Sequence, residues 1–111
     1  MVFIESIAFT RRLKELAGAG ADDVLSEIQK DLLAKPDRGV MPRHLGGIRK
    51  ERTSNPGRGK GKRGGFRYMW LHLEEKHHIH LLFLLDKDEQ EDLSKQQQKL
   101  LKALVRQLKG A

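Results

Sequence analysis

The apolar and polar positions in the N-terminal third of the chain predict one short strand followed by two helices. The stretch VFIES (residues 2–6) is apolar and β-branched, as is typical of a strand. Next come apolar residues at the spacing of one helix face, namely Phe9, Leu13, Leu16 and Ala17. The sequence GAG (residues 18–20) ends that helix, and a second is expected to begin at Asp22 or Asp23, since either could cap it. The apolar stripe of this second helix is Leu25, Ile28 and Leu32, and Pro36 would end it.

The rest of the chain has the pattern of three strands and a last helix. Strands are predicted at residues 47–53, 66–73 and 78–85, with a glycine-rich connection at residues 55–65. The run HIHLLFLL (residues 78–85) is the most apolar, so we expect it at the centre of the sheet. A capping box starts the last helix at Ser94 and Gln97, and Gly110 is expected to follow the helix end. The apolar side of this helix is Leu100, Leu101, Leu104, Val105 and Leu108.

This order of elements, β-α-α-β-β-β-α, predicts the fold class. Helices that precede and follow a run of antiparallel strands are typical of an α+β domain. With 111 residues, of which 38% are apolar, the chain can bury one modest core. We therefore expect a single domain over residues 1–111, with a small antiparallel-rich sheet, two N-terminal helices and one C-terminal helix.

The formal net charge is +7 at pH 7, and the excess lies in one segment. Residues 43–67 contain nine Lys or Arg and one acid, whereas the remainder has 13 Lys or Arg against 14 acids. A concentrated basic segment on a neutral body indicates a polyanionic partner. Because the segment lies between two predicted strands rather than at a terminus, a loop held at a sheet edge is favoured over a disordered tail.

Composition also excludes several classes of protein. The chain has no cysteine, which excludes disulfides and cysteine-ligated metals and favours an intracellular protein. The N-terminus lacks the basic segment and the long apolar run of a signal peptide, and no stretch approaches the roughly 18 apolar residues of a membrane span. We expect a cytoplasmic protein that does not associate with a membrane.

Several short motifs suggest other chemistry but lack the required context. The motif GKGKRG (residues 59–64) has the spacing of a dinucleotide fingerprint, but it precedes a strand and lacks the Ser or Thr of a P-loop. HHIH (residues 77–80) has no carboxylate or cysteine nearby to complete a metal site, and DKDEQED (residues 86–92) lacks the alternation of a calcium loop. The glycines would let a phosphate backbone approach the amide groups, although a solvated loop explains them equally well.

Several short motifs occur in this chain in an order and at a spacing that resemble those of a known protein family. GGIRKER (residues 46–52) is followed by GKGKRGG (residues 59–65), by Arg67, and by KDE and EDLS within residues 87–94. The series spans about residues 45–105 and resembles the HigB branch of the RelE superfamily of bacterial toxins.

The resemblance implies a small α+β fold like that of microbial ribonucleases and a toxin of a type II toxin–antitoxin system. Such toxins cut messenger RNA, usually on the translating ribosome, and use no metal or other cofactor. The 2′-hydroxyl of the substrate attacks the adjacent phosphate and leaves a 2′,3′-cyclic phosphate and a 5′-hydroxyl. The expected partner is a cognate, HigA-like antitoxin with a helix-turn-helix domain, and the toxin would contact operator DNA only through it.

By position in these motifs, Arg67 would stabilise charge on the phosphate and Lys87 would be its catalytic partner. The residues expected to bind messenger or ribosomal RNA are Arg49, Lys50, Arg52, Lys60, Lys62, Arg63 and Tyr68. Tyr68 or Trp70 could stack on a base. Strand alternation places Arg67 on the opposite face from Phe66, Tyr68 and Trp70.

Three departures from the family pattern leave other functions open. Leu85 stands where the family often has a tyrosine, and Asp88 stands in place of an asparagine. Glu51 occupies a strand position that is expected to be apolar. A second hypothesis is therefore a catalytically weak or inactive RNA- or ribosome-binding protein on the same fold. A third hypothesis, a DNA-binding or structural partner in a regulatory complex, is disfavoured because no predicted helix is basic enough to read a groove.

Overall fold

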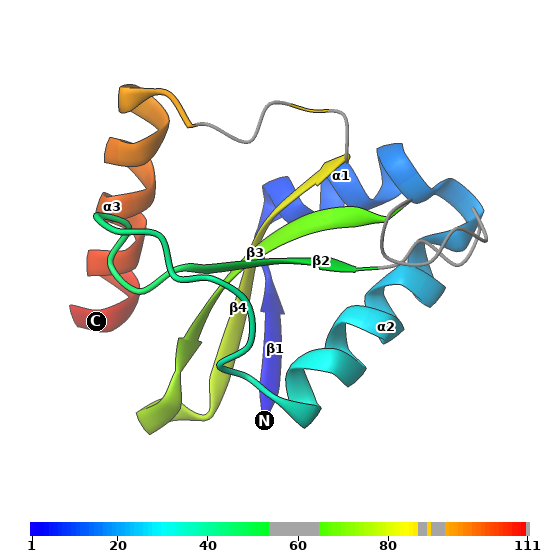
Figure 1. The fold of residues 1–111 in the computed structure, drawn as a ribbon, viewed down its shortest axis with the longest axis horizontal. Coiled ribbons are helices and arrows are strands. Elements are labelled where there is room, and N and C mark those ends of the chain that lie inside the picture. The colour runs from blue at the N-terminus through cyan, green and yellow to red at the C-terminus, as the bar shows by residue number, and fades with distance from the viewer. Residues whose placement is uncertain (54–64, 87–88, 90–92, 111) are drawn as a thin grey trace.

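The computed structural model describes residues 1–53, 65–86, 89 and 93–110, in which one sheet lies between helices on both faces (Figure 1). The elements are β1 (Val2–Glu5), α1 (Ile7–Ala17), α2 (Ala21–Ala34), β2 (Arg49–Thr53), β3 (Phe66–Leu73), β4 (His78–Asp86) and α3 (Lys95–Gly110). Short 3-10 turns at Gly18–Gly20 and Glu74–Lys76 join α1 to α2 and β3 to β4. This confirms the predicted α+β fold and its order of elements.

The sheet has the strand order β1-β4-β3-β2. The pairs β2–β3 and β3–β4 are antiparallel, whereas β1 runs parallel to β4. The strand β4 therefore has a neighbour on each side, as predicted from its apolar sequence. No helix in the described part of the chain has the length and apolar character to cross a membrane.

Two apolar layers bury the sheet, one on each face. Helices α1 and α2 cover the face that carries Phe66, Tyr68 and Trp70, and helix α3 covers the face that carries Met69 and Leu71 (Figure 1). A strand buried on both faces has few polar positions, which explains the continuous apolar runs in β3 and β4. The structure also confirms that Arg67, between Phe66 and Tyr68, faces away from α1 and α2.

Strand β4 contains a β-bulge at Leu82. Met69 pairs with Phe83 and Trp70 pairs with Leu81, so Leu82 has no partner in β3. Leu81 belongs to the layer under α1 and α2, whereas Leu82 belongs to the layer under α3. The bulge reverses the alternation beyond this point, and it places Leu85 opposite Arg67 on the same face of the sheet.

Two helix starts show where short-range signals succeed and fail. Ser94 and Gln97 form the predicted capping box, with Ser94 N donating to Gln97 Oε1 at 2.9 Å and Gln97 N donating to Ser94 Oγ at 3.1 Å. The cap predicted for α2 at Asp22 or Asp23 is wrong, because α2 begins at Ala21 with Gly20 at the cap position and without a side-chain cap. Both aspartates lie in the first turn, where their charge still favours the helix dipole.

Three other boundaries or contacts differ from the sequence prediction. The second strand begins at Arg49 rather than at residue 47, because Gly46 and Gly47 have φ angles of 70° and 104°, which an extended strand does not allow. Val24 rather than Leu25 is fully buried on α2. Gly110 is the last residue of α3 rather than the residue after it.

Candidate functional site

Arg67 lies near the start of β3, on the sheet face that α3 covers only in part. In the register of the sheet it is opposite Arg52 of β2 and Leu85 of β4. Lys50 lies two residues before Arg52 and so shares its face. The sequence places these three cations on adjacent strands, and the sheet brings them to one surface.

Two adjoining pockets lie over this surface, and Lys50 and Arg67 line both of them. The larger pocket, of about 270 Å³, is also lined by Arg43 and His44 from the segment before β2 and by Gln98 of α3. The smaller pocket, of about 170 Å³, adds Arg52. We refer to Arg43, Lys50, Arg52 and Arg67 together as the cationic pocket.

Arg52 and Arg67 lie directly opposite each other in the β2–β3 pair. The acid between Lys50 and Arg52, Glu51, also lines the smaller pocket. Its carboxylate lies 3.7 Å from Nε of Arg38 and accepts a hydrogen bond from the Arg52 N–H at 2.9 Å. Several cations that line one pocket attract an anion, and a phosphate has the right charge.

Lys50 is held in place by the segment that precedes β2. Its N–H donates to Val40 O at 2.8 Å, and Val40 N donates back to Lys50 O at 3.0 Å. Gly39 makes this approach possible, because a Cβ at that position would lie 2.3 Å from Lys50 O, and its φ of 76° is one that favours glycine. The backbone of Lys50 is therefore fixed on both sides, by β3 and by the Val40 bridge.

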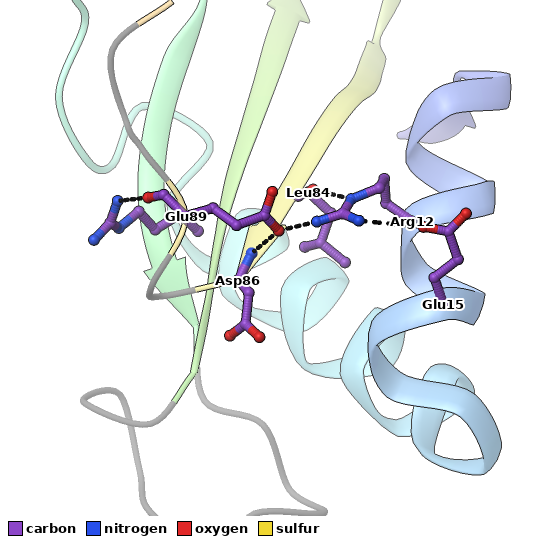
Figure 2. Close-up of polar contacts among 6 residues, drawn as sticks. Arg12, Glu15, Leu84, Asp86 and Glu89 are labelled. Atoms are coloured by element: carbon purple, nitrogen blue, oxygen red, sulfur yellow. Dashed lines mark hydrogen bonds and ion pairs between the residues drawn. The ribbon is translucent and has the colours of Figure 1, made fainter.

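Glu89 links Arg67 to helix α1. The Arg67 Nη1 donates to the main-chain oxygen of Glu89 at 3.2 Å. The carboxylate of Glu89 reaches the other way, where it accepts hydrogen bonds from Arg12 Nη2 and from Asp86 N–H, the latter at 3.0 Å (Figure 2). Arg12 also contacts Glu15 and Leu84 O, at 3.2 and 3.5 Å. Sequence reasoning assigned no role to either residue: Glu89 belongs to the KDE motif at residues 87–89, and no motif includes Arg12.

The structure corrects the expectation that Tyr68 stacks on RNA. Its side chain is 0% exposed, as is that of Trp70, and the two rings lie 5.0 Å apart between their centroids. Burial raises the pKa of the Tyr68 hydroxyl, so the group stays neutral. Both rings face α1 and α2, which cover that side of the sheet, and neither is available to a base.

Arg49 is separated from the cationic pocket. It pairs with Trp70, so it faces the α2 side of the sheet, and its Nη1 donates to Asp37 O at 2.8 Å. Lys60, Lys62, Arg63 and Lys87 lie outside the described residues, and their roles stay predictions. The described ends of the chain beside them meet at one place, because Phe66 pairs with both Thr53 and Asp86.

Helix α3 carries a basic stripe that the sequence analysis overlooked. Among its 16 residues it has no acid and five cations, namely Lys95, Lys99, Lys102, Arg106 and Lys109. At 100° per residue these fall within an arc of about 80°, and they extend for about 21 Å along the helix. All five residues are exposed. The prediction that no helix is basic enough to read a groove did not take this stripe into account, and the signal that identifies the stripe is the 4-3-4-3 spacing of its cations.

The histidines do not form a metal site in the structure. Within the described ranges, no three His, Cys, Asp or Glu side chains are grouped closely enough to hold an ion. His78 and His80 lie on one face of β4, with ring centroids 6.0 Å apart. Desolvation and the neighbouring His78 lower the pKa of His80.

No protein-family model matches the chain. Solved structures of Escherichia coli proteins resemble it in fold. A mutant of the toxin RelE with two arginine-to-alanine substitutions, in the free state, aligns over 78% of this chain and 83% of that one, with a TM-score of 0.57 and 11% identity. The intact RelBE toxin–antitoxin complex aligns over 79% of this chain and 98% of that one, with a TM-score of 0.57 and 11% identity. The isolated RelE toxin aligns over 93% and 97%, with a TM-score of 0.53 and 11% identity. The chain therefore has the fold of the RelE toxin.

Proposed function

We propose that this chain is the toxin of a type II toxin–antitoxin system and that it cleaves messenger RNA on the translating ribosome. The fold of RelE supports the general class, and the sequence motifs favour the HigB branch. The observation that carries the proposal is that Arg43, Lys50, Arg52 and Arg67 line two adjoining pockets, each large enough for a phosphate group. Several cations that line one pocket are typical of a site that binds an anion.

The proposed reaction is attack of the RNA 2′-hydroxyl on the adjacent phosphorus. A base removes the 2′-hydroxyl proton, the bond from phosphorus to the 5′ oxygen breaks, and that oxygen takes up a proton. Negative charge builds up on the non-bridging phosphate oxygens in the transition state, where Arg67 would stabilise it most strongly. Lys50 and Arg52 would hold the neighbouring phosphates, and Lys87 would transfer a proton. The products would be a 2′,3′-cyclic phosphate and a 5′-hydroxyl.

The proposed partners follow from the same class of protein. One of the similar structures is a complex of the toxin RelE with its antitoxin, so we propose a cognate antitoxin for this chain too. A helix-turn-helix antitoxin of the HigA type would bring the toxin to operator DNA. Action on the ribosome would place the protein in the cytoplasm, with residues 1–111 acting as one domain.

Expression of the chain from a tightly controlled promoter in bacteria tests the proposal. We expect growth arrest and new messenger RNA 5′ ends within translated regions, and a 5′-hydroxyl at each new end. Ligation methods that require a 5′-phosphate would miss these ends until a kinase treats the RNA. A folded, well-expressed protein that produces no new ends would contradict the nuclease proposal.

One observation favours a second candidate function, which is RNA or ribosome binding without cleavage. Leu85 lines the larger pocket opposite Arg67, at the position where the family often has a tyrosine. A leucine can neither transfer a proton nor donate a hydrogen bond to a leaving group. Under this hypothesis RNA binding would be salt-sensitive, would weaken gradually as cations are removed one by one, and would yield no new RNA ends.

The basic stripe of α3 is expected to contribute to RNA binding. Replacement of Lys95, Lys99, Lys102 and Arg106 by glutamine should weaken binding to RNA and lower the slope of log K against log salt by about 3, at about 0.7 per lost phosphate contact. Lys109 is left in place because its Nζ donates to Gly46 O at 2.7 Å. Filter binding or fluorescence anisotropy between 50 and 300 mM salt, on the order of the physiological range, would measure the slope.

The matched control for this experiment removes the same charge from the opposite side of the sheet. Four exposed cations on or after α1 and α2, namely Arg11, Lys14, Lys30 and Lys35, are replaced by glutamine. An equal change in slope for the two variants would mean that net charge alone governs binding. Tight binding of a specific DNA duplex by the isolated chain would instead revive a role in DNA recognition.

A further inference from the structure

We propose that Arg12 and Glu89 are positioning residues for Arg67. In this proposal the α1 helix fixes the position of Glu89 through the Arg12–Glu89 pair, and the main-chain oxygen of Glu89 fixes the direction of the Arg67 guanidinium. The proposal rests on the proposed function in one respect only, which is that Arg67 acts on a phosphate. The contacts themselves do not depend on it.

The geometry gives Glu89 two separate roles. Its side chain accepts hydrogen bonds from Arg12 Nη2 and from the Asp86 N–H (Figure 2). Its main-chain N–H donates to Asp86 O at 3.0 Å, at the end of β4. Its main-chain oxygen is then directed to Arg67 Nη1 at 3.2 Å. The side chain therefore anchors the residue, and the backbone of the same residue contacts Arg67.

Arg12 contacts Glu89 from a different part of the chain. It lies on α1, and its three guanidinium nitrogens contact Glu89, Glu15 and the main-chain oxygen of Leu84 in β4 (Figure 2). An arginine with several fixed donors holds a carboxylate in one orientation better than a lysine would. Arg12 and Glu89 are 77 positions apart in the sequence, so only the folded protein provides this contact.

The solvent exposure of Arg12 and Glu89 indicates that their ion pair positions Arg67 rather than stabilises the fold. The side chains of Arg12 and Glu89 are 29% and 38% exposed, and ion pairs with this much exposure contribute little to folding. In contrast, displacement of a catalytic group by about 1 Å can reduce a rate by about 100-fold. The proposal therefore predicts a loss of turnover that is out of proportion to any loss of stability.

The test compares Arg12→Ala and Glu89→Gln with Glu15→Gln. The Glu15 carboxylate also contacts Arg12, at 3.2 Å, but it has no contact with Asp86 or Arg67, so Glu15→Gln is the matched control. In single-turnover cleavage of messenger RNA on programmed ribosomes, we expect kcat to fall about 10- to 100-fold for Arg12→Ala, with KM within about twofold of the wild type. The kcat of Glu89→Gln should fall less, because the amide oxygen still accepts hydrogen bonds. Arg12→Lys should retain more of the wild-type rate than Arg12→Ala.

A second readout does not require cleavage. The side-chain N–H resonances of Arg67 in ¹⁵N NMR spectra, identified by their absence from Arg67→Lys, should shift and broaden in Arg12→Ala but not in Glu15→Gln. If the wild-type protein fails to cleave RNA and these resonances still respond to Arg12, the function fails and the positioning role stands. Unchanged Arg67 resonances in Arg12→Ala and Glu89→Gln would overturn the positioning proposal, as would rates that fall equally in Arg12→Ala and Glu15→Gln.

Discussion

Replacement of Arg67 by alanine should reduce RNA cleavage by about 100- to 1,000-fold. This is the usual effect of removing one donor that stabilises developing negative charge in a transition state. Arg67 lines both parts of the cationic pocket, and it lies directly opposite Arg52 in the β2–β3 pair. Rates on programmed ribosomes, together with mapped 5′ ends in cells, measure the effect.

The Arg67→Ala protein should still fold, because Arg67 belongs to neither of the apolar layers that bury the sheet. Circular dichroism and a thermal midpoint within a few degrees of the wild type would establish this. Arg11→Ala, which removes an exposed guanidinium from α1, serves as the matched control and should retain full activity. If both variants cleave RNA at the wild-type rate, Arg67 is not a catalytic residue.

Replacement of Trp70 by alanine should lower the free energy of unfolding by about 3–5 kcal/mol. Trp70 is 0% exposed, packs against Tyr68, and donates from Nε1 to Pro36 O at 3.1 Å. Because a domain of this size is stable by only about 5–15 kcal/mol, the variant should be partly unfolded near body temperature. Urea unfolding followed by circular dichroism measures the change.

Two further variants define the cause of this loss. Trp70→Phe retains a buried ring but loses the hydrogen bond to Pro36. Its free energy of unfolding should lie between those of Trp70→Ala and the wild type. Leu33→Ala removes a large apolar side chain that is 58% exposed on α2, and it should change stability by less than about 0.5 kcal/mol. A small effect of Trp70→Ala would mean that the layer under α1 and α2 tolerates a large cavity.

The sequence predicts the order of elements because each element repeats its own local signal. Strand β3 is predicted to the residue, and the alternation of Phe66, Arg67 and Tyr68 gives the correct face for the arginine. What local patterns do not contain is the identity of the element that covers each face. The expectation for Tyr68 fails for this reason, since an aromatic side chain on a strand looks the same whether a helix packs over it or not.

Part of the candidate site could also be predicted from the sequence, and part of it could not. The motifs identify Arg67, Lys50 and Arg52 as candidates, and the register of the sheet brings them together. Arg49 directly precedes Lys50 in β2, so strand alternation places the two side chains on opposite faces of the sheet. The sequence alone could therefore have separated Arg49 from these three residues. In contrast, Arg12 and Glu89 meet only through the packing of α1 against β4, so no spacing rule could have related them.

The bulge at Leu82 has a consequence for any comparison of this chain with its relatives. Leu82 is a single extra residue relative to β3, so the strand changes phase between Leu81 and Phe83. When a related sequence lacks that residue, the gap in the alignment belongs at Leu82. If the gap is opened a few positions later, the alignment pairs residues whose side chains point to opposite faces of the sheet. Leu85, which lies beside Arg67, would then be aligned with a core residue of the relative.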